Sequence, residues 1–162
     1  MTGGIPGLGK STWIKNHLST FSGRTKIISR DEIRFSLLKD NEDYFSKEKE
    51  VWTEFIKQIK KSLKENDNTI IDATHLNERS RAKVLRAIGA DLKNVEINII
   101  FFVGSSDLAI ARNKNRTGRS LVPESTIKNM ATQVSIPDFN EGFTNIYIIK
   151  AENNQIIKRI GE

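Results

Sequence analysis

A glycine-rich loop at residues 4–11 constrains this chain more than any other feature of its sequence. The loop reads GIPGLGKS and fits the pattern G-x-x-x-x-G-K-[ST]. Its glycines allow backbone amides to curl around phosphate oxygens, and the helix that follows adds the positive end of its dipole. A helical spacing of apolar residues begins directly after the loop, as it does in true phosphate-binding loops. The loop therefore predicts binding of a nucleoside triphosphate and leaves the phosphate acceptor open.

The polar residues at the end of this loop have separate expected roles. Lys10 would neutralise the β- and γ-phosphates of ATP and so contribute to catalysis. Ser11 would place its hydroxyl on Mg²⁺, a hard ion that prefers oxygen ligands and arrives with the nucleotide. In this part of the chain, the expected nucleotide-binding residues are Gly4, Ile5, Pro6, Gly7, Leu8, Gly9, Lys10, Ser11 and Thr12.

Length and composition favour one catalytic domain spanning residues 1–162. The 162 residues suit a single ordinary domain, and 37% hydrophobic residues are enough for a core. The absence of cysteine excludes disulfide scaffolds, zinc ribbons and thiol nucleophiles, and two histidines disfavour a multi-histidine metal site. No run approaches the roughly 20 apolar residues of a membrane span, and no signal region opens the sequence. We therefore expect a cytoplasmic protein without a membrane partner.

Basic residues outnumber acidic residues in this chain. The 26 Lys and Arg residues against 20 Asp and Glu residues give a formal net charge of +6. Such a balance favours polyanionic partners, which include nucleic acids, nucleotides and acidic surfaces, without choosing among them. Many of these charges are lysines of the amphipathic segment 46–65, which we interpret as a solvated helix face rather than a nucleic-acid track.

The pattern of apolar residues predicts an α/β fold of the P-loop NTPase type. Short β-branched runs alternate with helical periodicities, which is typical of a parallel sheet flanked by helices. A phosphate loop normally follows a buried strand, yet only three residues precede Gly4, so the first strand is expected to be missing or truncated. The expected strands are 25–29, 69–71, 95–103, 146–149 and 156–160, and the expected helices are 11–21, 31–38, 46–65, 77–88, 106–116 and 123–134.

Several separated motifs occur in the order typical of the polynucleotide 5'-hydroxyl kinases, and residues 4–134 resemble that family. The loop is similar to the family's G-x-P-G-x-G-K-S-T. Residues 29–34, SRDEIR, resemble the segment in which an aspartate acts as general base and an arginine three residues later holds the acceptor's phosphate. The resemblance implies these roles for Asp31 and Arg34, and a carboxylate suits the task because a sugar hydroxyl is a poor nucleophile. From the residues alone, the alternative is a helix-capping Asp31 and a solvated Arg34.

A second turn also resembles the family. Residues 71–77, IDATHLN, are similar to its D-x-T-N-x-N turn, in which polar side chains line the acceptor site. The resemblance implies that Asp72 orients Arg34 or a magnesium-bound water and that Thr74 contacts the acceptor. His75 stands where the family has asparagine, and we interpret it as a partly exposed turn residue without a catalytic role.

Residues 112–116, RNKNR, followed by LVP at 121–123, resemble the family's helical lid, R-x-x-x-R and then V-P. Arginines at positions i and i+4 share one helix face, so both would reach over bound nucleotide. The resemblance implies that Arg116 stabilises charge on the transferring γ-phosphoryl group, and that Arg112 and Val122 flank the adenine. The alternative for these arginines is a solvated basic helix.

The leading hypothesis from the sequence is a kinase that uses ATP and Mg²⁺ to phosphorylate the 5'-hydroxyl end of RNA or DNA during end repair. A cation beside the base favours this hypothesis, because an acceptor with a phosphate on its 3' side requires one. A kinase of a small metabolite or nucleoside, built on the same loop, base and lid, is one alternative. A non-catalytic nucleotide-binding protein is the other.

Overall fold

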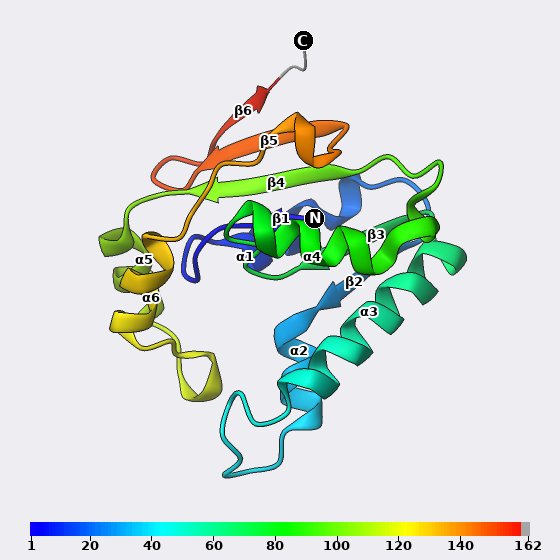
Figure 1. Ribbon diagram of the computed structural model, residues 1–162. Coiled ribbons are helices and arrows are strands. Elements are labelled where there is room, and N and C mark those ends of the chain that lie inside the picture. The colour runs from blue at the N-terminus through cyan, green and yellow to red at the C-terminus, as the bar shows by residue number, and fades with distance from the viewer. Residues whose placement is uncertain (160–162) are drawn as a thin grey trace.

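A computed structural model describes residues 1–159, and its strands lie in one layer with helices around it (Figure 1). Strands β1, β4 and β5 pair in parallel, and β6 pairs antiparallel with β5. Strands β2 and β3 form a second parallel ladder. The strands are β1 (Thr2–Gly3), β2 (Thr25–Ser29), β3 (Asn68–Asp72), β4 (Asn98–Val103), β5 (Asn145–Lys150) and β6 (Gln155–Arg159).

The strand before the phosphate loop is present but has only two residues. Thr2 and Gly3 pair with Ile100 and Phe101 of β4. On the other side, the Gly4 amide donates to the carbonyl oxygen of Thr74 at 2.7 Å, directly after β3. The two ladders therefore meet at β1, and the strands run in the order β2-β3-β1-β4-β5-β6. The expectation of a truncated strand is confirmed, and that of a missing strand is wrong.

The short β1 leaves space between its two neighbours. A cavity of about 480 Å³ lies between the first residues of β3 and β4, and Met1 and Thr2 border it. Ile14 lines it from α1 (Lys10–His17), and Ile88 lines it from α4 (Glu78–Ile88). Over this stretch, helix side chains line the open space between the described strands β3 and β4, where no backbone pairing is present.

Most expected helices form close to their expected bounds. Side chains of Ser29, Asn77 and Ser105 cap three of them by accepting a backbone N–H of the first turn, as expected of Ser and Asn. The remaining helices are α2 (Arg30–Leu37), α3 (Glu48–Glu65), α5 (Ser106–Asn113) and α6 (Glu124–Ala131), with single 3₁₀ turns at Leu18–Thr20, Gly89–Leu92, Gly118–Ser120 and Phe139–Glu141.

Several elements are shorter than the sequence indicates. Helix α1 ends at His17 and α6 ends at Ala131, whereas the expected helices end at residues 21 and 134. The strand expected from Val95 begins at Asn98, because the residues just before it form a turn in which the Val95 amide donates to Leu92. The helix expected to reach Arg116 ends at Asn113. Of the last expected strand, Ile160 lies outside the described residues, and Gln155–Arg159 form β6.

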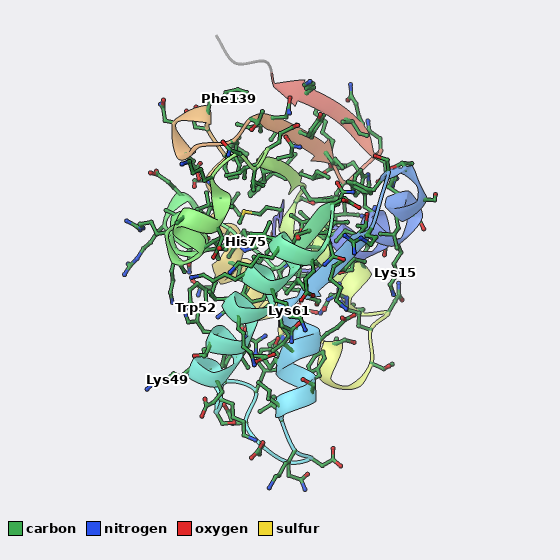
Figure 2. All side chains as sticks on the ribbon, turned by 90° about the vertical axis from the view of Figure 1, so that its right-hand side faces the viewer. Lys15, Lys49, Trp52, Lys61, His75 and Phe139 are labelled. Carbon is green, nitrogen blue, oxygen red and sulfur yellow. The ribbon has the colours of Figure 1, made fainter. Side chains whose placement is uncertain are left out.

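The long helix α3 has one apolar face and one charged face. Val51, Phe55 and Ile59 are fully buried against Ile28 of β2 and Ile71 of β3. The lysines on its other face are exposed or half-buried, and Figure 2 shows Lys49 pointing away from the ribbon into solvent. The interpretation of a solvated lysine face agrees with this arrangement.

A buried ion pair ties α4 to the chain before β5. Arg81 has no exposed surface, and its Nε and Nη2 donate to the two carboxylate oxygens of Glu141 at 2.6 and 2.7 Å. Its Nη1 donates to the carbonyl oxygens of Ser135 and His75 at 2.9 and 3.3 Å. The pair thereby fixes the turn after β3, which borders the phosphate loop.

Glu141→Gln should lower the free energy of unfolding by about 3 kcal/mol, because it leaves the Arg81 charge buried without a counter-charge. Urea denaturation followed by circular dichroism measures this quantity. Glu65→Gln is the matched control, since its partner Lys61 is at 4.0 Å and both side chains are more than half exposed. Equal unfolding free energies of the two variants would contradict a stabilising role for the buried pair.

Candidate active site

The phosphate loop is shaped by two glycines that no other residue can replace. Gly4 and Gly7 have φ values of 121° and 90°. A Cβ atom at Gly4 would lie 2.5 Å from the carbonyl oxygen of Phe102, and one at Gly7 would lie 2.4 Å from that of Ala109. Between the glycines, the side chain of Ile5 is fully buried and anchors the loop in the core. The loop is therefore held rigidly against the end of β4 and against α5.

Lys10 and Ser11 begin helix α1 at the end of this loop. The Lys10 ammonium lies within the loop and donates to the carbonyl oxygens of Gly4 and Ile5 at 2.8 and 2.9 Å. The Ser11 hydroxyl donates to Asp72 Oδ2 at 2.8 Å, and the buried Thr2 hydroxyl donates to Asp72 Oδ1 at 2.9 Å. Asp72, at the last position of β3, is thus fixed beside the loop.

This pair of oxygens fits a magnesium ion. The Ser11 hydroxyl and the Asp72 carboxylate are hard oxygen donors, the kind that Mg²⁺ prefers, and they adjoin a loop shaped for phosphates. Of the two roles expected for Asp72, contact with the magnesium shell agrees with these partners. The described hydrogen bonds of Arg34 go to Asp31, Tyr44 and Glu48 instead.

Charged side chains that were predicted from separate motifs act electrostatically on Lys10. Burial, together with the positive charge of Arg116, lowers the pKa of Lys10 to about 8, although the charges of Asp72 and Asp31 oppose this shift. These four side chains come from the loop, the lid, β3 and α2. The fold therefore gathers the expected phosphate-binding and base residues around one point.

Asp31 and Arg34, the two residues expected on the acceptor side of the site, lie in direct contact. Ser29 caps α2, so Asp31 is not the cap of this helix, and its side chain is 66% exposed. Arg34 is only 5% exposed, so the alternative of a solvated arginine is wrong. Its Nη1 donates to Asp31 Oδ1 at 2.7 Å, and its Nη2 donates to Glu48 Oε2 at 2.8 Å. Burial opposes the charge of Arg34, yet the hydrogen bond to Glu48 and nearby negative charges raise its pKa.

His75 differs from its expectation of partial exposure. Its side chain is 4% exposed and lies in the interior of the fold (Figure 2). Nδ1 lies 2.6 Å from the carbonyl oxygen of Thr2, and since a carbonyl only accepts, Nδ1 carries the proton. Burial lowers the pKa of His75 to about 3, so the ring is neutral and holds β1 in place. Thr74, one residue earlier, is half-buried beside Gly4.

The two lid arginines do not share a helix face, because α5 ends before Arg116. Arg112 lies in the last turn of α5 and donates to the carbonyl oxygen of Ala151 at 2.8 Å. Arg116 lies in the following turn, where its amide donates to Asn113 at 2.9 Å. The buried Asn113 side chain also exchanges two hydrogen bonds with the Val122 backbone, at 2.7 and 3.1 Å. This exchange closes the lid loop at its base.

A cavity of about 470 Å³ opens beside the phosphate loop, within the size range of small-molecule sites. Arg112 and Arg116 line it from the lid, and Trp13 lines it from α1, stacked on His17 at 4.1 Å. Val122 instead packs against the neighbouring core. Trp13 also packs against that core. Sequence reasoning missed His17 as a lining residue, although the i, i+4 spacing of Trp13 and His17 puts both on one face of α1. It also missed Asn16 and Asn154, which line the same cavity.

A mostly parallel sheet flanked by helices, with a phosphate loop between β1 and α1 and an acidic residue ending β3, defines the class of P-loop kinases. Within this class, the chain belongs to the AAA domain family, a P-loop kinase family whose model matches residues 1–137. Kinase, transferase and nucleotide-binding character follow from this membership. P-loop kinases generally use ATP and Mg²⁺.

Two solved structures share the fold at low sequence identity. A gluconokinase from Sinorhizobium meliloti 1021 is similar with a TM-score of 0.58 and 16% identity, over 93% of this chain and 80% of that chain. A deoxyadenosine kinase from M. mycoides, solved with dCMP and dCDP bound, is similar with a TM-score of 0.52 and 19% identity, over 93% and 88%. No curated protein sequence matches this chain significantly. Within residues 1–159, no helix has the length and apolarity needed to cross a membrane.

Lys10→Ala should weaken ATP binding by about tenfold or more, because it removes the charged hydrogen bonds of the ammonium to the phosphates. Ser11→Ala should abolish most of the gain in affinity that Mg²⁺ gives, because it removes one expected ligand of the ion. Calorimetric titration of ATP with and without Mg²⁺ measures both effects. Lys15→Ala, an exposed lysine of the same helix, is the control. Unchanged ATP affinity in Lys10→Ala would contradict this assignment of the loop.

Proposed function

We propose that this protein is a polynucleotide 5'-hydroxyl kinase that transfers the γ-phosphate of ATP to the 5'-OH end of RNA or DNA. The observation that carries the proposal is the Arg34 guanidinium, which is buried 2.7 Å from the exposed carboxylate of Asp31. Asp31 is the group expected to receive the proton of the attacking hydroxyl. A fixed cation beside it suits an acceptor that brings a phosphate next to its reacting end.

In the proposed reaction, the phosphate loop and Lys10 hold the β- and γ-phosphates in line with the acceptor. The acceptor's 5'-oxygen forms a bond to the γ-phosphorus as its proton passes to Asp31. The bond from that phosphorus to the oxygen bridging to the β-phosphate breaks, and ADP leaves with both electrons of the bond. Mg²⁺, held by Ser11 and Asp72, would neutralise phosphate charge when bound.

Arg116 has a separate role in the proposal. It lines the cavity beside the phosphate loop, and its charge lowers the pKa of Lys10. A cation there stabilises the negative charge that spreads over the γ-phosphoryl oxygens during transfer. Arg112, which also lines this cavity, would hold the adenine side of ATP.

The acceptor side of the proposal relies on Arg34, Thr74 and the net charge of +6. Arg34 would hold the phosphate on the 3' side of the first nucleotide, and Thr74 would contact the same nucleotide. The basic surface would attract the remaining phosphates of the strand through long-range electrostatics. Together these features give a polynucleotide contacts that a neutral acceptor does not have.

A nucleoside or small metabolite is the second candidate acceptor, favoured by the names of the two similar structures, a deoxyadenosine kinase and a gluconokinase. Both candidates use the same loop, base and lid. They differ in whether the acceptor carries a phosphate that requires Arg34. A comparison of acceptors with and without that phosphate therefore separates them.

Arg34→Ala should lower kcat/KM for a 5'-hydroxyl oligonucleotide by on the order of tenfold more than for the matching nucleoside, because only the oligonucleotide loses a charged phosphate contact. Transfer of radiolabel from ATP to both acceptors, and to gluconate and other sugars, gives the ratio. A general loss of activity in the variant lowers kcat/KM equally for both acceptors, so it does not change this ratio. An equal loss with both acceptors, or exclusive use of a nucleoside or sugar by the unaltered protein, would favour the second candidate.

Arg116→Ala should lower the single-turnover rate of transfer by on the order of 100-fold while ATP affinity falls much less, because a positioned cation acts most strongly on the charge redistributed in the transition state. Rapid-quench transfer measurements beside calorimetric ATP titration separate the two quantities. Lys114→Ala, an exposed lysine between the two lid arginines that pairs with Glu124, is the control. An unchanged rate with weakened affinity would make Arg116 a ground-state binder.

A further inference from the structure

Tyr44 lies in the segment between α2 and α3 and contacts the expected base directly. Its hydroxyl donates to Asp31 Oδ1 at 2.9 Å and accepts from Arg34 Nη1 at 2.9 Å. Arg34 Nη1 also donates to the same Asp31 oxygen at 2.7 Å. The three side chains therefore form a closed triangle of hydrogen bonds.

Both hydrogen bonds to the Asp31 carboxylate reach one oxygen. They hold Oδ1, and in the part of the chain that the structure describes no hydrogen bond reaches Oδ2. Because the Asp31 side chain is 66% exposed, Oδ2 is available to an incoming hydroxyl. Two donors on Oδ1 fix the plane of the carboxylate and so the direction in which Oδ2 accepts a proton.

The Tyr44 ring is itself held in position. It lies over the Arg34 guanidinium, with 4.5 Å from the ring centroid to Cζ, and it meets Phe35 and Phe45 edge-on at 6.2 and 4.9 Å. On its other side, Arg34 is bonded to Glu48, which also accepts from Arg30. The hydroxyl thus reaches Asp31 from a ring with little freedom to turn.

Burial and the nearby charge of Asp31 raise the pKa of Tyr44 to about 12. The hydroxyl therefore keeps its proton at any pH near neutrality and acts as a permanent donor. Among the described residues, the charges that act on Asp31 come from Arg34 of α2 and Lys10 of the loop. Neither of them changes charge over the acid range in which a carboxylate titrates.

We propose that Tyr44 is a positioning residue that holds Asp31 Oδ1 and so presents Oδ2 to the acceptor hydroxyl. This inference rests on the proposed function, since it takes Asp31 as the base. It gives the loop between α2 and α3 a catalytic purpose, because this loop carries Tyr44, a donor to Asp31 from outside α2. Tyr44 itself neither binds the acceptor nor carries its proton.

Tyr44→Phe tests the proposal, because it keeps the ring over Arg34 and removes only the hydroxyl. We expect kcat to fall about tenfold on the alkaline plateau with KM for ATP unchanged, since a charged hydrogen bond that orients the base is lost. We also expect the acid limb of the kcat profile to move to higher pH, because a carboxylate that loses a donor binds its proton more tightly. Tyr147→Phe is the matched control, since Tyr147 lies on β5 beside the apolar cavity.

The outcomes separate this inference from the proposed function. If Asp31→Asn transfers phosphate as fast as the unaltered protein, Asp31 is not the base and the proposed mechanism fails. If Asp31→Asn is inactive while Tyr44→Phe has an unaltered rate and pH profile, only the role of Tyr44 is overturned. A lower kcat in Tyr44→Phe with an unmoved acid limb and a matching fall in melting temperature would also overturn it, because that result describes a purely structural residue.

Discussion

The carboxylate of Asp72 connects β3 to both β1 and helix α1, and the rest of the fold depends on this connection. One of its oxygens accepts from Thr2 of β1, and the other accepts from Ser11 of α1. β1 has only two residues and an apolar cavity of about 480 Å³ beside it; its backbone pairs with β4, and on the β3 side the Gly4 amide donates to Thr74. The Asp72 hydrogen bonds and the His75 bond to the Thr2 carbonyl add side-chain connections to this short strand. The Asp72 carboxylate thus both contacts the end of the phosphate loop and helps to hold β1 in the sheet.

Hydrogen bonds hold two cationic side chains of the site before any phosphate binds. Lys10 donates to carbonyl oxygens of its own loop, and Arg34 is bonded to the carboxylates of Asp31 and Glu48. These contacts keep the two side chains in fixed places. Fixed dipoles and charges stabilise a polyphosphate more than mobile ones do, since no reorganisation is required when the ligand arrives. The buried Arg81–Glu141 pair extends this order to the turn that carries Thr74 and His75.

Local sequence patterns predicted the parts of the fold that depend on interactions between residues close in sequence. The glycines of the loop and the apolar stripe of α3 each determine their local structure within a few residues. The partner of Asp72, by contrast, is 61 residues distant in sequence, and the burial of His75 follows from a contact with Thr2 across 73 residues. No local signal records such contacts. The lid helix ends at Asn113, whose side chain bonds to the backbone of Val122. The pattern of apolar residues around Asn113 does not predict this partner.

The two halves of the site differ in how the chain builds them. The nucleotide half joins the loop to the end of β3 through the hydrogen bond between Ser11 and Asp72, which spans 61 residues, and the lid arginines line the cavity beside the loop. Apart from Thr74, the proposed acceptor half lies within one segment, from Arg30 to Glu48, whose hydrogen bonds to Asp31 and Arg34 span between 3 and 14 residues. Substitutions in that segment can reshape the acceptor side while Lys10, Ser11 and Asp72 keep their positions, because none of the described hydrogen bonds joins the two sets of side chains directly. Under the proposed function, this segment therefore contributes most to the acceptor preference, since it places two arginines, a tyrosine and a glutamate around the proposed base Asp31.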